Sequence, residues 1–461
     1  MTQDDLAQLS REELIQLVLA QAEQLSQLQA DYEALRLKLE KGKKPPPNSS
    51  NSSQPPSRDH KRSLPSDRRK HKHGPPLGHE KHERKFVAKP DYIVAVKAKT
   101  CLNCHADMSF AEGVLLDVNQ ITELPPAKAE VIEVRQYELT CPECGKAQVG
   151  EPAVGLEMER AFGARLEATV VYYRQEQHMS YQRTQAALAN LHGVEISQGG
   201  IDKIMQRAGN QALQEVEPIL EIVRQSQVIH SDETSSRVDG VNWWEWVFCT
   251  WTAVLHVIRD NRSVDVIKAV MAKAQAQVWV SDCWTGQLKA PALQRQLCLA
   301  HQLRNLQSVV DAQPLLFWPR AMQTLFRYAI HLHHQRLRLT PEQFTVQATR
   351  IERLCNWLLL RSLSPPEAQK LQHRYQKYRS CLFVFLYRTD VEPTNNVAER
   401  ALRPSVIHRK VTGGFRSEWG AIAYAALASV IDTAELSGIL AFDAIQSLFG
   451  SPSLPIPSGG E

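Results

Sequence analysis

The chain has 461 residues, of which 43% are hydrophobic, and its formal net charge is +4. This length predicts about three domains with a substantial core. No apolar run reaches the roughly 18 residues of a membrane span, and the start MTQDDLAQLS lacks the basic and apolar parts of a secretory signal. We therefore expect a cytoplasmic protein rather than a membrane or secreted one.

Residues 1–40 are expected to form a single helix. Apolar positions in this stretch alternate steps of four and three, which is the spacing of a coiled-coil seam. An amphipathic helix packed on its own body is the alternative. The basic segment that follows favours self-association, so we expect an oligomer. The seam positions are Leu14, Val18, Gln21, Leu25, Leu28, Tyr32, Leu35 and Leu39.

Residues 41–95 are interpreted as a flexible, basic linker. The run KKPPPNSSNSSQPPS is too polar to bury a core. Residues 41–85 hold 13 Lys or Arg against 4 Asp or Glu, a charge of +9, so the rest of the chain carries −5. This asymmetry favours a polyanion such as DNA as partner, although a linker that only aids solubility fits equally well. The candidate DNA contacts are Lys61, Arg62, Arg68, Arg69 and Lys70.

Residues 96–155 are expected to form a zinc-binding domain that resembles a zinc ribbon. Cys101 and Cys104 form one C-x-x-C pair, and Cys141 and Cys144 form another. Zn²⁺ prefers four tetrahedral ligands, which two such pairs can supply. The strand-like runs YIVAVKA and EVIEVRQYEL flank the pairs. A redox C-x-x-C is the alternative, but nothing around the pairs has a thioredoxin-like pattern.

Residues 156–224 have a helical pattern with a candidate helix-turn-helix. A helix that ends near Leu191 meets a break at Gly193, and Ser197 can cap a second helix from Gln198. This layout is typical of DNA-reading motifs, but many helical hairpins share it. Gln198 and Lys203 would then contact DNA.

Residues 225–310 change to an α/β pattern. Four short apolar runs, VIHSDE, WWEWVFCTW, AVLHVIRD and VWVSD, predict strands, with a helix before the last one. Residues 286–390 are mostly helical in pattern, and residues 391–461 end in two further helices. Asp232 and Asp282 stand at the ends of two predicted strands, where their carboxylates can converge. Mg²⁺ prefers such hard oxygen ligands, and two ions can activate the attacking and leaving oxygens of a phosphodiester.

Glu399 is the best candidate for a third carboxylate. It lies among five Lys and Arg residues between positions 395 and 416, and Thr394 or Asn395 can cap a helix that holds it. A single acid among cations suits a metal site beside DNA phosphates. The plainer alternative is that Glu399 and Arg403 form an i,i+4 helix pair.

The segment Cys298-Leu-Ala-His301, followed by Arg304, is another compact cluster. It could brace the site or bind a metal weakly, or it could be a simple strand-to-helix turn.

These motifs resemble the transposases of the bacterial insertion sequence 66 family along nearly the whole chain. NNVAERALRPSVIHRK (395–410) is the most specific of them. Gln287 departs from the family, because it lies in a region where members often carry a tyrosine after the second Asp. The other resembling segments are the N-terminal helix, NSSNSSQPPS, Leu124-Pro125-Pro126 between the cysteine pairs, SDET (231–234), WWEWVF (243–248), VSDCW (280–284) and CLAHQLRNL (298–306).

The resemblance implies an RNase H-like catalytic core split by a helical insertion at 311–390, with Asp232, Asp282 and Glu399 as a DDE triad on Mg²⁺ or Mn²⁺. It implies nicking at terminal inverted repeats, then attack of the freed 3′ hydroxyl on target DNA, by an oligomer at the bacterial nucleoid. A nuclease that does not join strands, and a non-catalytic zinc-containing DNA-binding protein, are the alternatives. Supporting residues would be Cys298, His301, Arg304, Asn396, Arg400, Arg403, Arg409 and Lys410.

Overall fold

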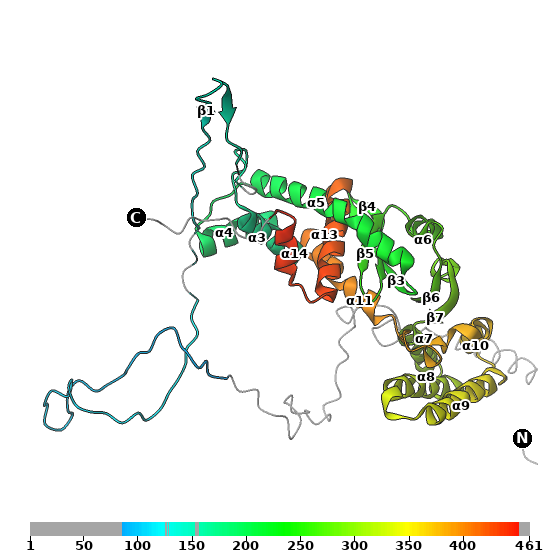
Figure 1. The fold of residues 1–461 in the computed structure, drawn as a ribbon. Coiled ribbons are helices and arrows are strands. Elements are labelled where there is room, and N and C mark those ends of the chain that lie inside the picture. Colours follow the sequence, from blue (N-terminus) through cyan, green and yellow to red (C-terminus); the bar gives the residue numbers. More distant parts are fainter. Residues whose placement is uncertain (1–84, 125–126, 128, 153–155, 451–461) are drawn as a thin grey trace, which may run out of the picture. The chain divides into compact units, whose positions relative to one another are not determined.

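The computed structural model describes residues 85–450, except 125, 126, 128 and 153–155 (Figure 1). The predicted coiled coil and the basic residues from Lys61 to Lys70 lie outside the described residues. Contacts divide the described chain into two units. The larger contains residues 133–185 and 196–450, and the smaller contains residues 85–132 and 186–195.

The strands predicted beside the cysteine pairs are almost entirely absent from the described chain. Residues 92–98 have no regular secondary structure, and of residues 130–139 only the last two belong to a strand. That strand, β1 (Glu138–Thr140), pairs with β2 (Ala147–Val149) in a short antiparallel hairpin. The prediction was wrong because β-rich residues form a strand only beside a partner, and Tyr92 and Val96 are 88% and 95% exposed.

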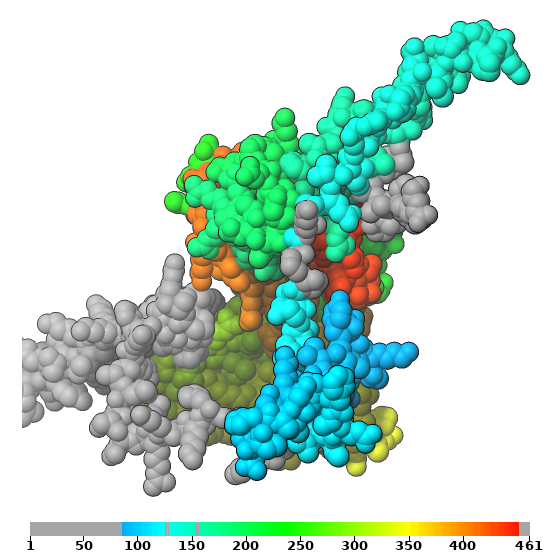
Figure 2. Space-filling model, turned by 90° about the vertical axis from the view of Figure 1, so that its left-hand side faces the viewer, coloured from blue at the N-terminus to red at the C-terminus, as the bar shows by residue number. Residues whose placement is uncertain are grey.

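Three helices precede the sheet: α3 (Ala164–Gln175), α4 (Tyr181–His192) and α5 (Gln198–Gln225). The break between α4 and α5 falls at Gly193, whose φ of 65° suits glycine. The predicted cap is confirmed, because the Ser197 hydroxyl accepts a hydrogen bond from the Gly200 N–H at 3.0 Å. At 28 residues, α5 extends well beyond the predicted motif. Its residues appear in green on the surface in Figure 2.

A mixed five-stranded sheet forms the centre of the larger unit. Its order is β5-β4-β3-β6-β7, in which β3, β4 and β5 are antiparallel while β6 and β7 run parallel to β3. One strand, β7, lies in a stretch predicted to be helical. Its residues Gln294, Arg295 and Gln296 carry no apolar signal because β7 is an edge strand. The strands are β3 (Val228–Val238), β4 (Val241–Cys249), β5 (Val254–Arg259), β6 (Ala276–Ser281) and β7 (Ala292–Leu297).

One face of the sheet is covered by the end of α5 and by α6 (Val264–Met271). Side chains of alternate strand positions point to this face, including Ile229, Trp246 and Trp279. They pack with Ile219 and Val223 of α5. This long helix therefore extends from the predicted cap Ser197 to the sheet.

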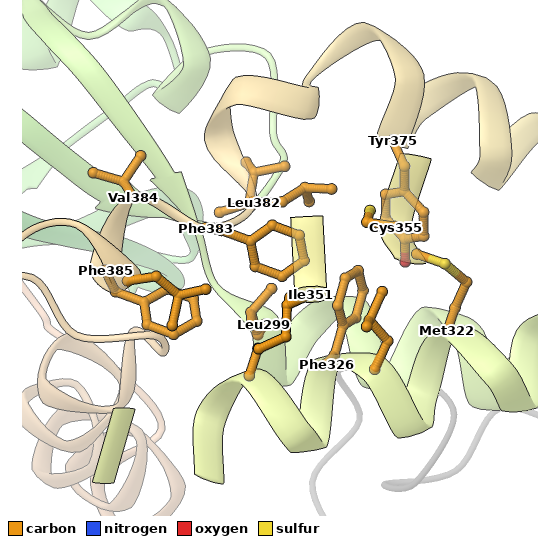
Figure 3. Packing of buried hydrophobic residues seen from close by; sticks show 14 of the residues in the cluster. Leu299, Met322, Phe326, Ile351, Cys355, Tyr375, Leu382, Phe383, Val384 and Phe385 are labelled. Carbon is orange, nitrogen blue, oxygen red and sulfur yellow. The ribbon is translucent and has the colours of Figure 1, made fainter. Parts of the chain in front are cut away.

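The opposite face packs against helices from the 311–390 region. Leu299 and Phe326 belong to one continuous core with Ile351, Tyr375 and Phe385, and this core also contains strand residues such as Val280 (Figure 3). The predicted insertion is thus part of the main core. The elements are α7 (Leu299–Ala312), α8 (Phe317–His334), α9 (Pro341–Leu359) and α10 (Pro366–Lys377), with short 3-10 helices η2 (Gln287–Lys289), η3 (Arg336–Arg338), η4 (Arg379–Cys381) and η5 (Val384–Leu386).

The C-terminal helices return to this second face. Ala398 and Leu402 pack on Val247, while Tyr424 packs on Ile258 farther along the sheet. No helix in the described part of the chain is both long and apolar enough to span a membrane. The helices are α11 (Asn396–Ala401), α12 (Arg403–Thr412), α13 (Glu418–Leu436) and α14 (Ala441–Ser447).

Candidate active site

Strand register brings the two predicted aspartates to the same level on two neighbouring interior strands of the sheet. In the parallel pair β3 and β6, Val228 lies opposite Val278 and His230 opposite Val280. Continuing this register by two residues places Asp232 level with Asp282, which directly follows β6. The carboxylates therefore come from adjacent strands, as the sequence predicted. The prediction that Asp232 ends its strand was wrong, because β3 continues to Val238 in its pairing with β4.

Glu399 lies near the same strands because hydrogen bonds of Asn395 hold the start of α11 against β3. The Asn395 amide donates to the Ser231 carbonyl at 2.8 Å, and its oxygen lies 3.3 Å from His230 Nδ1. Asn395 does occupy the cap position of α11, but its side chain makes no capping hydrogen bond. The prediction of a capping side chain was wrong because these buried groups on β3 use the amide instead.

Cys298 connects the remaining segments of the site. Its N–H donates to the Ser281 carbonyl at 2.8 Å, and its sulfur accepts from the Asn395 N–H at 3.1 Å. The neighbouring Leu299 N–H donates to the Pro393 carbonyl at 2.9 Å. Cys298 therefore links the start of α7 to two other segments: its N–H binds the end of β6, and its buried sulfur binds the start of α11. Burial raises the pKa of this thiol to about 11.

The three acids lie close enough to influence one another. Burial raises the pKa of Asp232 well above its ordinary value, and the negative charges of Glu233, Asp282 and Glu399 raise it further. A buried carboxylate with acidic neighbours is stabilised by a bound cation. The oxygen donors of Asp232, Asp282 and Glu399 are of the kind that Mg²⁺ or Mn²⁺ prefers, so the residues fit the predicted ions.

Glu399 also has basic partners. Arg304 donates to both of its carboxylate oxygens, at 3.1 and 3.4 Å, and His301 Nδ1 lies 3.4 Å from Oε1. Burial and the Arg304 charge lower the pKa of His301. The alternative helix pair is not observed in the described chain, since Glu399 pairs with Arg304 and Arg403 is exposed.

Glu233 is a fourth acid, which the sequence analysis did not single out. It alternates with Asp232 along β3 and therefore points to the opposite face of the sheet. Its side chain is 1% exposed, and it accepts hydrogen bonds from Arg262 at 2.6 and 2.8 Å and from Gln287 at 2.7 Å. The Arg262 guanidinium lies over the Trp244 and Trp284 rings.

Gln287, the residue that departs from the family pattern, is fully buried in this network. Its oxygen accepts from Trp279 Nε1 at 2.9 Å, and its nitrogen donates to Ser231 as well as to Glu233. The Trp284 N–H donates to the Asp282 carboxylate at 2.8 Å. Gln287 thus helps to fix the loop that follows Asp282.

The other predicted supporting residues are less closely involved. Arg409 donates to the Ser235 hydroxyl at 3.3 Å. Four residues lie on the exposed surface of α11 and α12, where they can meet a ligand from solvent: Asn396, Arg400, Arg403 and Lys410. Gln198 and Lys203 are exposed in the first turns of α5.

Each cysteine pair lies in the same kind of tight turn. The Cys101 carbonyl accepts from the His105 N–H, and the Cys141 carbonyl accepts from the Gly145 N–H, both at 2.9 Å. In each turn, backbone N–H groups two and three residues along donate to the first sulfur and lower its pKa. Such turns suit thiolate ligands, but a shared zinc ion remains a prediction.

A second buried charge network lies on the same face of the sheet as Asp232. His256 contacts Glu245 and Asp432, both at 3.0 Å, and Ser405 donates to Glu245 at 2.5 Å. Burial alone would lower the pKa of His256, but its hydrogen bonds to Asp432 and Glu245 outweigh burial and raise it to about 9. The histidine is therefore charged at neutral pH.

The larger unit thus carries carboxylates on β3, directly after β6 and on α11, beside exposed basic residues, which is typical of enzymes that process nucleic acids with divalent ions. The sequence model of the family described as Transposase IS66 family matches residues 159–423, more than half of the chain. The protein therefore belongs to the IS66 family of transposases. A search of curated proteins gives no match.

Proposed function

We propose that the protein is a DDE transposase whose triad is Asp232, Asp282 and Glu399. The observation that supports this proposal most is that the charges of Asp282 and Glu399, two acids distant in sequence, both raise the pKa of Asp232. An RNase H-like core is the corresponding fold, and it is supported by two acids on adjacent parallel strands of a mixed sheet. The reaction would be nicking at the transposon ends, followed by joining of the 3′ hydroxyl to target DNA.

In this proposal the three carboxylates hold two Mg²⁺ or Mn²⁺ ions. Bound ions would activate the attacking oxygen and stabilise the leaving oxygen of the phosphodiester. The chain itself supplies position: Asn395 holds α11 against β3, and Cys298 holds α7 against both. Arg304 keeps Glu399 compensated in the absence of ions and can turn to a DNA phosphate when they bind.

DNA would be bound by several basic segments. The exposed Arg400, Arg403 and Lys410 lie on the helices next to Glu399, where they can contact phosphates near the reacting bond. Gln198 and Lys203 would read sequence from the start of α5. The linker from Lys61 to Lys70 would add nonspecific attraction, and the N-terminal helix would pair copies of the chain on chromosomal DNA.

We also propose that Cys101, Cys104, Cys141 and Cys144 bind one structural Zn²⁺. The support is the matching pair of turns, each with N–H groups directed at a sulfur. In metal analysis of the purified proteins, a Cys141→Ser variant should contain one zinc per chain fewer than the wild type. Equal zinc in both proteins would contradict this assignment.

The catalytic proposal is tested by strand transfer. Oligonucleotides with the element's own end sequence, a supercoiled target plasmid and Mg²⁺ should yield joined products with the wild type. Asp232→Asn, Asp282→Asn and Glu399→Gln should each reduce joining by at least about 1,000-fold. Asp265→Asn, which alters an exposed acid on α6, is the matched control and should remain active.

The alternatives give different results in the same assay. Cleavage without joining would identify a nuclease. End binding with neither cleavage nor joining, unchanged by the three substitutions, would identify a non-catalytic DNA-binding protein.

A further inference from the structure

The segment Cys298-Leu-Ala-His301, at the start of α7, shares one feature with the two C-x-x-C turns: backbone N–H groups beside the first sulfur. The sulfur of Cys298 accepts hydrogen bonds from the N–H groups of Ala300 and His301, two and three residues along. Cys101 accepts from the residues at the same two offsets. In all three turns the fourth residue carries a potential ligand, which at this turn is an imidazole. N–H groups that donate to a sulfur orient and stabilise it as a metal ligand.

Glu399 brings a third donor to this turn. One ligand atom each from Cys298, His301 and Glu399 lies within 4.8 Å of the others. Ligands bound tetrahedrally to Zn²⁺ at 2.0–2.3 Å lie about 3.3–3.8 Å apart. The separation of His301 Nδ1 and Glu399 Oε1, 3.4 Å, already falls in this range. Only a small movement of the sulfur or the carboxylate is needed to complete three ligands.

The histidine nitrogen is available for this role. His301 Nδ1 is buried and makes no hydrogen bond within the described chain, even though Glu399 is near. An unpaired buried nitrogen costs stability, which a bound ion would recover. Arg304 is the competing partner of Glu399. Because the Arg304 side chain is partly exposed, it can move away when an ion binds.

We propose that Cys298, His301 and Glu399 form a separate site for Zn²⁺ or a similar borderline ion. Thiolate and imidazole ligands select such ions over Mg²⁺, whereas Asp232 and Asp282 offer only oxygen. Three protein ligands leave one coordination position for water. Because the two sites share Glu399, Zn²⁺ binding removes a ligand from the Mg²⁺ set. It therefore inhibits strand transfer, a consequence that rests on the proposed function.

The metal site is tested with Co²⁺, which reports thiolate ligation by a near-ultraviolet charge-transfer band. The wild type should bind one more Co²⁺ per chain than Cys298→Ser, with a matching loss of thiolate absorption in the variant. Cys355→Ser removes a buried core cysteine on α9, away from the cluster, and should bind as much Co²⁺ as the wild type. Equal Co²⁺ binding and equal spectra for wild type and Cys298→Ser would overturn the proposal.

A second variant protects the test against misfolding at the buried cysteine. His301→Gln should also lose one Co²⁺ per chain, with its circular dichroism spectrum unchanged. In the strand-transfer assay at fixed Mg²⁺, half-inhibition of this variant should need at least about ten-fold more Zn²⁺ than the wild type. If no protein joins strands but the Co²⁺ difference persists, the proposed function fails and the metal site stands.

Discussion

Two groups of acids share one face of the sheet but have opposite electrostatic balance. Asp232, Val247 and His256 lie level with one another across β3, β4 and β5. At the β3 end, Asp232 is surrounded by further acids. At the β5 end, Glu245 and Asp432 are joined by a charged histidine.

The difference separates a binding site from a structural brace. The His256 network compensates its own charges, so it stabilises the packing of α13 and α12 on the sheet. Arg262 and Arg304 pair with Glu233 and Glu399, but within the described chain no basic residue pairs with Asp232 itself, so we expect Asp232 to accept a cation from solution. A buried carboxylate without a charged partner of its own is therefore a better candidate for a metal ligand than one with such a partner.

The largest expected effect comes from removing the internal cation. His256→Gln leaves Glu245 and Asp432 buried without their charged partner and should lower the free energy of unfolding by about 3–5 kcal/mol. Urea unfolding at pH 7 measures it. The matched control is His230→Gln, because burial lowers the pKa of His230 to about 4 and it is neutral at this pH. A larger loss for His230→Gln would break the comparison.

The stabilisation by charged His256 should depend on pH. The folded pKa of His256, about 9, lies above its unfolded value near 6.5. Its contribution is therefore complete below pH 6.5 and disappears as pH rises through 9, a change of about 3 kcal/mol. The difference in unfolding free energy between wild type and His256→Gln, measured by urea at several pH values, should shrink across this window. A constant difference would show that His256 is uncharged in the folded protein.

A smaller loss of stability is expected from breaking the contact between α11 and β3. Asn395→Ala removes the hydrogen bond to the Ser231 carbonyl and should cost about 1–3 kcal/mol of stability. It should also reduce strand transfer, because α11 no longer holds Glu399 in place. Asn242→Ala, at an exposed position near the start of β4, is the control and should change neither. Unaltered joining by Asn395→Ala would show that another contact positions Glu399.

The smallest expected effect is a change in the free energy of unfolding that has opposite signs in the two regions. Asp232 has a raised pKa, so its charge destabilises the metal-free protein at pH 7. Asp232→Asn should therefore raise stability by about 1 kcal/mol in EDTA, as followed by thermal unfolding. Glu245→Gln, the same chemical change in the other region, should lower it. Mg²⁺ should stabilise the wild type and leave Asp232→Asn unchanged; stabilisation of both equally would place the ion elsewhere.

The sequence was most informative about the acids themselves. Asp232 and Asp282 each end an apolar run, and such runs pair in parallel when a helix intervenes. Glu399 has no strand of its own, and its position as a single acid among five Lys and Arg residues, after a possible helix cap, singled it out. Glu233 went unnoticed because its role depends on Arg262 and Gln287, which are separate in sequence and carry no pattern.

Contacts between distant segments could not be predicted. The pairing of Arg304 with Glu399 spans 95 residues, and that of His256 with Asp432 spans 176. Such pairs depend on how the helices pack on the sheet, and local composition does not predict that packing. The polar edge strand β7 shows the same limit for secondary structure, because its pairing with β6 is a property of the assembled sheet.

The length of α5 sets a distance scale for DNA recognition. From Gln198 to Ile219 the helix rises 1.5 Å per residue, or about 32 Å, before it meets the sheet. Duplex DNA advances about 3.4 Å per base pair, so this span matches roughly nine base pairs. If the first turns of α5 contact the terminal repeat, the helix fixes the distance between those contacts and the sheet. Bases that specify binding would then lie about one duplex turn inward from the bond that is cut.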